Sequence, residues 1–355
     1  MIQYDYRISF NTPAFLGNSE QTGQWRTPPL KALLRQWWRV AFAAGQHASV
    51  DVETMRREEG LLFGVAADGR EGSRKSRIRI RLDRWDTGKL KTWDRLEQAV
   101  VHHPEVEKTR YKVGPHAYLG FGPLDGRHNT RFSEKVNAAI QAGETATLSL
   151  AFEETHRKIL EQTLWLISHY GTLGGRSRNG WGSLSLTPSN NESPALDGPL
   201  ESGKSDFLLD WRRALKRDWP HGIGRDERPL IWRTSACDDW KFVMRQLAEI
   251  KIGLRTQFKF LNNMRPPHQK PLDRHWLSYP ITRHSVRGWG HARLPNSLRF
   301  KVRHDGKGKP YGVVVHVPCA PPAAFSPDLA AIEQVWSRVH RFLDDPAHML
   351  TRIPA

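Results

Sequence analysis

Hydrophobic positions in the first half of the chain follow the periods of strands and helices in turn. Residues 2–10 and 145–152 alternate apolar and polar side chains, which is typical of half-buried strands. Residues 30–45 carry apolar side chains at three- and four-residue spacing after Pro28 and Pro29, which predicts a helix. The same reasoning predicts a strand over 76–85, a helix over about 154–170 and a strand over 183–186.

The order strand, helix, strand, strand, helix, strand predicts a ferredoxin-like domain over residues 1–187, an arrangement that RNA-recognition domains share. Residues 86–144, between the middle strands, are too many for a hairpin and predict an insertion with irregular segments. Residues 188–204 are rich in Pro, Ser, Asn and Gly and predict a linker. We expect residues 205–355 to form a second, more elaborated ferredoxin-like domain, so the predicted fold class is α+β.

The pattern in the second half is weaker. It predicts helices near 206–219, 238–256 and 327–342 and strands at 297–304 and 311–317. Four tryptophans there suit either a protein interface or a core, and a core is the more common use; they are Trp211, Trp219, Trp232 and Trp240.

Charge points to a polyanionic partner. The chain has 54 Lys and Arg against 37 Asp and Glu, a net charge of +17, and fixed positive charge attracts phosphate and releases its counterions. RNA or DNA is the first candidate and an acidic membrane the second. With no apolar signal-peptide core, no run long enough to span a bilayer and only Cys237 and Cys319, we expect a reduced cytoplasmic protein.

Two basic stretches are candidates for RNA contact. Four-residue spacing places Lys31, Arg35 and Arg39 on one face of the first helix, which has no acidic residue, and Trp38 lies near that face as a candidate for base stacking. The alternative is an ordinary solvated face. In the strand over 76–85, Arg77, Arg79 and Arg81 share one face and therefore need anions nearby, either RNA or a row of carboxylates.

The third candidate is the loop GTLGGRSRNGWGSLSL, residues 171–186. It lacks the Lys-Ser/Thr ending of a nucleotide-binding P-loop, and its glycines follow a helix instead of opening one. A glycine pair after a helix is by default a cap and a turn. The run of polar residues after it indicates more, because glycines let the backbone approach a ligand and arginines supply charge and hydrogen-bond forks. The row Arg176, Ser177, Arg178 and Asn179 therefore suits a polynucleotide backbone better than a mononucleotide.

This loop resembles the glycine-rich loop of the RAMP superfamily of CRISPR-associated proteins. Three further segments, TPAFLG at 12–17, LKALLRQWWR at 30–39 and LLFG at 61–64, resemble one branch of it in the same order. That branch is the first subunit of the type III-B (Cmr) effector complex. The second half is similar only loosely, at RLPNSLRFKV over 293–302.

The resemblance implies two ferredoxin-like domains at the head of a crRNA-guided complex, near the 3′ part of the crRNA. It implies a non-catalytic subunit that holds the crRNA and the target RNA beside other RAMP subunits. Carried onto this sequence, the resemblance implies that the basic face of the first helix, with Lys31, Arg35 and Arg39, lines the same groove as the loop. It also implies contacts with RNA backbone from six loop residues, which are Gly174, Gly175, Arg176, Ser177, Arg178 and Asn179.

The sequence predicts no catalytic residue, metal site or cofactor, because it has no HExxH, no paired cysteines and no carboxylate cluster at helical spacing. Two alternatives stay open. Some RAMP relatives cut precursor crRNA without metal by general acid–base chemistry, for which His116 or His284 would serve here. A protein–protein adaptor whose charge serves solubility is the other.

Overall fold

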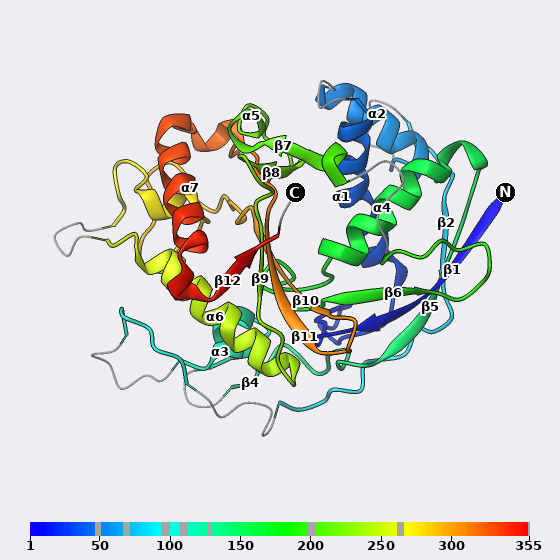
Figure 1. Cartoon of the computed structure of the whole chain (residues 1–355), viewed down its shortest axis with the longest axis horizontal. Helices are drawn as coiled ribbons and strands as arrows, with labels where there is room; N and C mark the ends of the chain where they lie inside the picture. Colours follow the sequence, from blue (N-terminus) through cyan, green and yellow to red (C-terminus); the bar gives the residue numbers. More distant parts are fainter. Residues whose placement is uncertain are drawn as a thin grey trace.

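Two four-stranded antiparallel sheets organise the chain (Figure 1). The computed structural model describes residues 1–46, 51–66, 72–93, 100–106, 113–126, 130–197, 204–260 and 266–353. The first sheet has the order β2-β5-β1-β6, with β1 (Ile2–Phe10), β2 (Arg79–Leu82), β5 (Thr145–Phe152) and β6 (Leu184–Pro188). The second has the order β10-β11-β9-β12, with β9 (Ile231–Thr234), β10 (Leu298–His304), β11 (Pro310–His316) and β12 (Leu350–Arg352).

The two units built on these sheets have the same topology. In the first, α1 (Thr27–Gly45) follows β1 and α4 (Arg157–Tyr170) follows β5. In the second, α6 (Trp240–Thr256) follows β9 and α7 (Leu329–Asp344) follows β11. In both, the first strand is central, flanked by the last strand on one side and the third on the other. The predicted mixture of helices with antiparallel sheets is confirmed.

The first sheet has one buried and one open face. On β1 the residues Tyr4, Tyr6 and Ile8 are buried in a core shared with α1 and α4, whereas Gln3 and Arg7 between them are exposed. The alternation read from the sequence therefore corresponds to the two faces of a sheet that is covered on one side.

The second sheet is covered on both sides. Every residue of β11 is buried, and so are the first five residues of β10. Val302 and Val314 pack in one core with residues of α6 and α7, and Val313 and Val315 pack in the other core with residues of α1 and α4. The layers are therefore sheet, helices, sheet, helices, with α1 and α4 between the sheets (Figure 1).

Directed hydrogen bonds join the units. Lys301 of β10 is fully buried, and its Nζ donates to the carbonyl oxygens of Ile167 at 2.8 Å and Ser168 at 2.7 Å. These carbonyls belong to the last turn of α4, where the helix dipole favours a cation. Next to it, the backbone N–H of Val302 donates to Oγ of Ser183 at 2.8 Å.

Most predicted elements are present, and the strands at 2–10 and 145–152 have the predicted bounds. The helix predicted over 206–219 is wrong: a short strand, β7 (Leu208–Asp210), pairs with β8 (Ile223–Arg225), and this region holds only the end of a 3-10 helix and the single α-helical turn α5 (Trp211–Ala214). The sequence analysis missed α2 (Val52–Phe63), β9 and β12. Short 3-10 helices lie at Glu154–His156, Lys204–Phe207, Asp273–Trp276, Ala323–Phe325 and Pro346–His348.

The insertion predicted over 86–144 extends to the second unit. Its described part contains α3 (Pro115–Gly120), β3 (Leu124–Asp125) and β4 (Arg131–Phe132), and α3 packs on α6. The described part of the predicted linker packs back on β1, where Oγ of Ser193 accepts from the N–H of Asp5 at 2.8 Å. Of the four tryptophans singled out in the sequence, Trp211, Trp219 and Trp232 are buried in the core and Trp240 is half-buried.

We predict that Lys301→Met lowers the free energy of unfolding by about 1–3 kcal/mol, because two buried helix-end carbonyls lose their donor. Denaturant unfolding of the whole chain measures it. Lys307→Met is the matched control, since Lys307 is exposed in the turn after the same strand. Equal stability of the two variants would contradict a structural role for the Lys301 ammonium.

Candidate nucleic-acid interface

The glycine-rich loop over 171–186 lies between the two units and is held from both sides. The N–H of Gly175 donates to the carbonyl of Phe15 at 2.9 Å, and Oγ1 of Thr12 donates to the carbonyl of Gly180 at 2.7 Å. From the second unit, the N–H of Phe300 donates to the carbonyl of Arg178 at 3.0 Å. The TPAFLG segment and the glycine-rich loop are thus two halves of one structural unit.

Packing within the protein explains the glycines. Gly174 has φ +95°, and a Cβ there would lie 2.7 Å from the carbonyl oxygen of Phe15. Gly182 has φ +63°, and a Cβ there would lie 1.8 Å from the carbonyl oxygen of Leu173. The close approach expected between these glycines and a ligand is taken up by the chain's own backbone.

A groove with a volume of about 1180 Å³ opens beside this loop. Its walls are the loop, α3 from the insertion, the C-terminal part of α6 and the segment over 274–284. Cationic side chains from all the walls except α3 line it; they are Arg176, Lys251, Arg255, Lys259 and Arg274. Two acidic residues, Glu105 and Asp125, line it as well.

All of these cations except Arg274 lack a carboxylate partner among the ion pairs of the described residues. Nζ of Lys251 donates to Oδ1 of Asn179 at 2.6 Å, and a guanidinium nitrogen of Arg255 lies 3.3 Å from the hydroxyl of Tyr118. Burial, then the charges of Arg255 and Arg176, holds the pKa of Lys251 well below its usual range. Burial and neighbouring arginines also lower the pKa of Arg176. Such mutual repulsion favours an anion in the groove.

The other groove charges are compensated or peripheral. The guanidinium of Arg274 is paired with the carboxylate of Glu105, and Asp125 lies 3.6 Å from a guanidinium nitrogen of Arg131. Lys259 is exposed at the edge. The uncompensated positive charge is therefore concentrated where the loop meets α6.

Aromatic rings accompany these cations. Phe121, directly after α3, lines the groove and is 60% exposed. Phe260 stacks on His284 with ring centroids 3.6 Å apart, and His284 also lines the groove. A cationic groove with an exposed ring suits a single-stranded nucleic acid, whose bases stack on such rings. The sequence analysis missed Phe121, Lys251 and Arg255, although the last two have the four-residue spacing that identified the first helix.

The predicted contact residues of the glycine-rich loop contribute to different sites. Arg176 and Asn179 line the groove, and the amide nitrogen of Asn179 donates to the carbonyl of Leu119 at 2.7 Å. Arg178 lines a smaller cavity instead. Ser177 is half-buried, and its carbonyl accepts from the N–H of Gly180 at 3.1 Å. The structure therefore brings only part of the predicted loop site into the groove.

The basic face of α1 has a partner that the sequence analysis did not foresee. Glu59 of α2 is buried and pairs with both Arg35 and Arg39, with 2.6 Å between its Oε1 and a guanidinium nitrogen of Arg35. The expectation that these arginines lack a local partner is wrong. Lys31 is half-buried, and none of the three lines the groove. Their contact with RNA stays a prediction.

The stacking role expected for Trp38 is contradicted. Its side chain is 3% exposed and stacks on Phe42 with ring centroids 4.7 Å apart, edge-on to Phe63. The helical spacing placed Trp37 on the apolar face and Trp38 near the basic one, but the packing of α2 on α1 buries the ring of Trp38 as well.

The arginines at β2 are placed as the alternation predicts. Arg77, Arg79 and Arg81 are exposed, whereas Ile78 and Leu82 are buried. No ion pair joins these arginines to a carboxylate in the part of the chain that the structure describes. β2 is an edge strand of the first sheet and does not line the groove, so RNA contact by Arg77 and Arg79 stays a prediction as well.

Comparison with known proteins extends this picture. The family model described as "RAMP superfamily" matches residues 8–185, half of the chain. The chain belongs to the RAMP superfamily. The matched range contains TPAFLG, the first helix, LLFG and nearly all of the glycine-rich loop. Among curated proteins, none matches this RAMP sequence.

Solved structures are similar to this RAMP protein at low sequence identity. One is titled "Crystal structure of Cmr1 from Pyrococcus furiosus (apo form)"; it has a TM-score of 0.49 and 17% identity over 99% of this chain and 98% of the other. A chain of the "Type III-B Cmr-beta bound to cognate target RNA" has a TM-score of 0.47 and 10% identity over 95% and 99%. A chain of a "Type IV-B CRISPR Complex" covers 58% of this chain and 97% of its own, with a TM-score of 0.31 and 14% identity.

The histidines of this RAMP protein that the sequence singled out differ in place. His116 is buried, with Nε2 3.3 Å from the carbonyl oxygen of Lys241. His284 lines the groove, with Nδ1 3.0 Å from Nε2 of His268. Within the described ranges, no three His, Cys, Asp or Glu residues are grouped to hold a metal ion, and no helix is long and apolar enough to cross a membrane.

We predict that Glu59→Gln in this RAMP protein lowers the free energy of unfolding by about 1–2 kcal/mol, a value discounted for the partial exposure of both arginines. Burial alone would raise the pKa of Glu59, but the hydrogen bonds and charges of Arg39 and Arg35 more than offset it, and the pKa is lowered. A carboxylate with a depressed folded-state pKa stabilises the protein above its ordinary pKa, and that stabilisation is lost as the pH falls through the folded-state value.

The difference in stability between wild type and Glu59→Gln should therefore be full at pH 7 and shrink below about pH 4.5, the ordinary value for glutamate. Denaturant unfolding across this pH range measures it. Glu58→Gln, at the adjacent and more exposed carboxylate paired with Arg57, is the control. A difference that is constant with pH would rule out the ionic role.

Proposed function

We propose that this chain is an RNA-binding, non-catalytic subunit of a type III CRISPR effector complex that holds the crRNA, its target RNA, or both. The observation that carries the proposal is the groove, where Arg176, Lys251 and Arg255 gather beside an exposed Phe121 and have no carboxylate partner among the described residues. Membership of the RAMP superfamily supports it, and the four segments resembling the first Cmr subunit support the complex type.

We infer in addition that both units are ferredoxin-like domains. Each has two helices and a four-stranded antiparallel sheet in which the first strand lies between the third and the last. Other RAMP subunits are the expected protein partners, the 3′ part of the crRNA is the expected ligand, and the cytoplasm is the expected compartment.

The geometry favours sequence-independent recognition. Guanidinium and ammonium groups bind phosphates whatever the base, and an aromatic face stacks any base. We predict that Arg176→Ala and Arg255→Ala each weaken binding of all single-stranded RNAs alike. Each lost phosphate contact should flatten the slope of log affinity against log salt by about 0.7.

Fluorescence anisotropy with a labelled repeat RNA and an unrelated RNA, each over a salt series, measures both quantities. Arg245→Ala is the matched control, because Arg245 lies on α6 outside the groove and pairs with Glu249. Phe121→Ala should lower affinity by about 1–3 kcal/mol per stacked base and leave the salt slope unchanged. If Arg176→Ala and Arg255→Ala behave like Arg245→Ala, RNA does not bind in this groove.

A second candidate function is metal-independent cleavage of precursor crRNA, and the place of His284 in the groove favours it. Burial lowers the pKa of His284, and the charges of His268 and Arg274 lower it further. At neutral pH the imidazole is therefore neutral and able to accept a proton from a 2′-hydroxyl, with the groove cations available for the leaving oxygen.

This candidate predicts that the chain cuts repeat RNA in EDTA and that His284→Ala abolishes the cut. His291→Ala, at an exposed histidine outside the groove, should cut like wild type. Gel analysis of end-labelled RNA measures it. Intact RNA after incubation with wild-type protein, in EDTA and in magnesium alike, eliminates this candidate and leaves the binding function standing.

A further inference from the structure

A second cavity, with a volume of about 150 Å³, lies where the two units meet. Arg178 of the glycine-rich loop and Arg299 of β10 both line it, together with Asn296, Ser297 and Cys319. Asp218 lines its exposed rim. Arg176, two residues earlier in the loop, lines the RNA groove instead. The loop therefore contributes one arginine to each of two separate sites.

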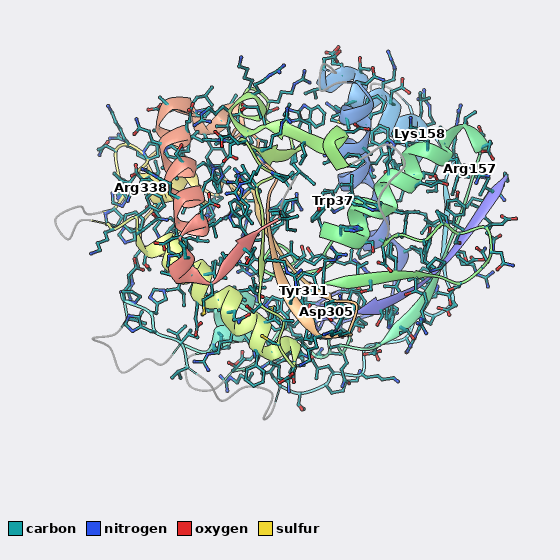
Figure 2. All side chains as sticks on the ribbon, in the orientation of Figure 1. Trp37, Arg157, Lys158, Asp305, Tyr311 and Arg338 are labelled. Carbon is teal, nitrogen blue, oxygen red and sulfur yellow. The ribbon has the colours of Figure 1, made fainter. Side chains whose placement is uncertain are left out.

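Arg299 is buried without a counter-charge. It is 6% exposed, and its guanidinium carbon lies 5.4 Å from the ring centroid of Trp37 on α1, a residue at the junction of the units (Figure 2). With the amide of Gln36 oriented so that its oxygen faces the guanidinium, that oxygen accepts at 2.9 Å. In the part of the chain that the structure describes, no group accepts a hydrogen bond from Nε of Arg299. A neutral amide and a ring face solvate a cation but do not neutralise it.

Arg178 brings a second positive charge close to Arg299, and the neutral thiol of Cys319 does not offset it. Burial, then the charge of Arg178, lowers the pKa of Arg299 to about 9, and burial lowers the pKa of Arg178 as well. Burial raises the pKa of the Cys319 thiol to about 11, so the thiol is neutral. Among the described residues, no ion pair joins Asp218 to either arginine. Two partly desolvated guanidinium groups thus face one small cavity without compensation, which is unfavourable unless an anion joins them.

We propose that the cavity between Arg178 and Arg299 binds a phosphate-sized oxyanion. Guanidinium forks match the oxygens of a phosphate group, and two forks from different elements bind it from two sides. About 150 Å³ suits one phosphate group rather than a whole nucleotide. Because the arginines come from the loop of the first unit and a strand of the second, the anion stabilises the junction. It is either a phosphate of bound RNA or a free phosphate ion.

Thermal unfolding in a phosphate-free buffer, titrated with inorganic phosphate against sodium chloride of equal ionic strength, tests the proposal. A ligand that binds only the folded state raises Tm with its concentration. Wild type should show a saturable phosphate-specific rise in Tm that Arg178→Ala and Arg299→Met both lose. Without phosphate, Arg299→Met should melt no lower than wild type, because it removes an uncompensated buried charge.

Two controls keep their phosphate response if the proposal holds. Arg303→Met changes a half-buried arginine on β10 that does not line the cavity, and Arg255→Ala changes a groove cation. If Arg299→Met does not fold, Arg178→Ala gives the same test, since Arg178 is only half-buried. A wild type without a phosphate-specific rise, or a rise that Arg178→Ala keeps in full, overturns the proposal.

A single-stranded RNA added to the titration distinguishes the two sources. If RNA raises the phosphate concentration needed for half the rise, an RNA phosphate occupies the cavity. If the half-saturating concentration is unchanged, the ligand is a free ion. Loss of RNA binding in the groove variants with the phosphate response intact would separate this site from the proposed RNA function.

Discussion

The C-terminal end of α4 is the constraint on which the junction of the two units depends. Its last carbonyls face the second unit, where the ammonium of the buried Lys301 donates to two of them. This fixes β10 against α4. Arg299, two residues before Lys301 on β10, has its guanidinium against the ring of Trp37 on α1. The N–H of Phe300, which lies between Arg299 and Lys301, donates to the carbonyl of Arg178. This contact fixes the position of the glycine-rich loop, from which Arg176 lines the groove and Arg178 lines the smaller cavity.

The same junction decides how the excess charge is distributed. Ion pairs with nearby carboxylates offset part of the positive charge. Glu59 pairs with Arg35 and Arg39, and Glu105 pairs with Arg274. Of the uncompensated cations among the described residues, some are exposed to solvent, such as Arg77, Arg79 and Arg81, and others lie at the junction among neutral groups. Those on the groove side meet amide and hydroxyl oxygens, and Arg299 meets a ring and an amide. The net charge of +17 therefore says little about where a ligand binds until the charges paired with carboxylates are set aside.

The sequence allowed the first unit to be predicted because each long element there carries a clear period. β1 and β5 alternate strictly, since one face of their sheet meets solvent. The second sheet lacks that signal because both its faces are buried, and β9 and β12 are too short to show any period. The residues of the candidate nucleic-acid interface were harder to predict than the secondary structure of either unit. Glu59 pairs with Arg39 from the next helix along the chain, and α3 reaches α6 from an insertion whose place no local pattern specifies.

The units share one topology, but the first sheet is covered on one face and the second on both, and this bears on the proposed RNA binding. RNA-recognition domains stack bases on aromatic side chains of the sheet face. Here the second sheet's face is covered by α1 and α4, and the open face of the first presents short polar side chains and arginine, such as Arg7 and Ser149, with its tyrosines turned inward. A ring for base stacking must then come from outside the sheets. Phe121, carried on the insertion that closes the groove, is such a ring, so the insertion supplies what the sheets cannot.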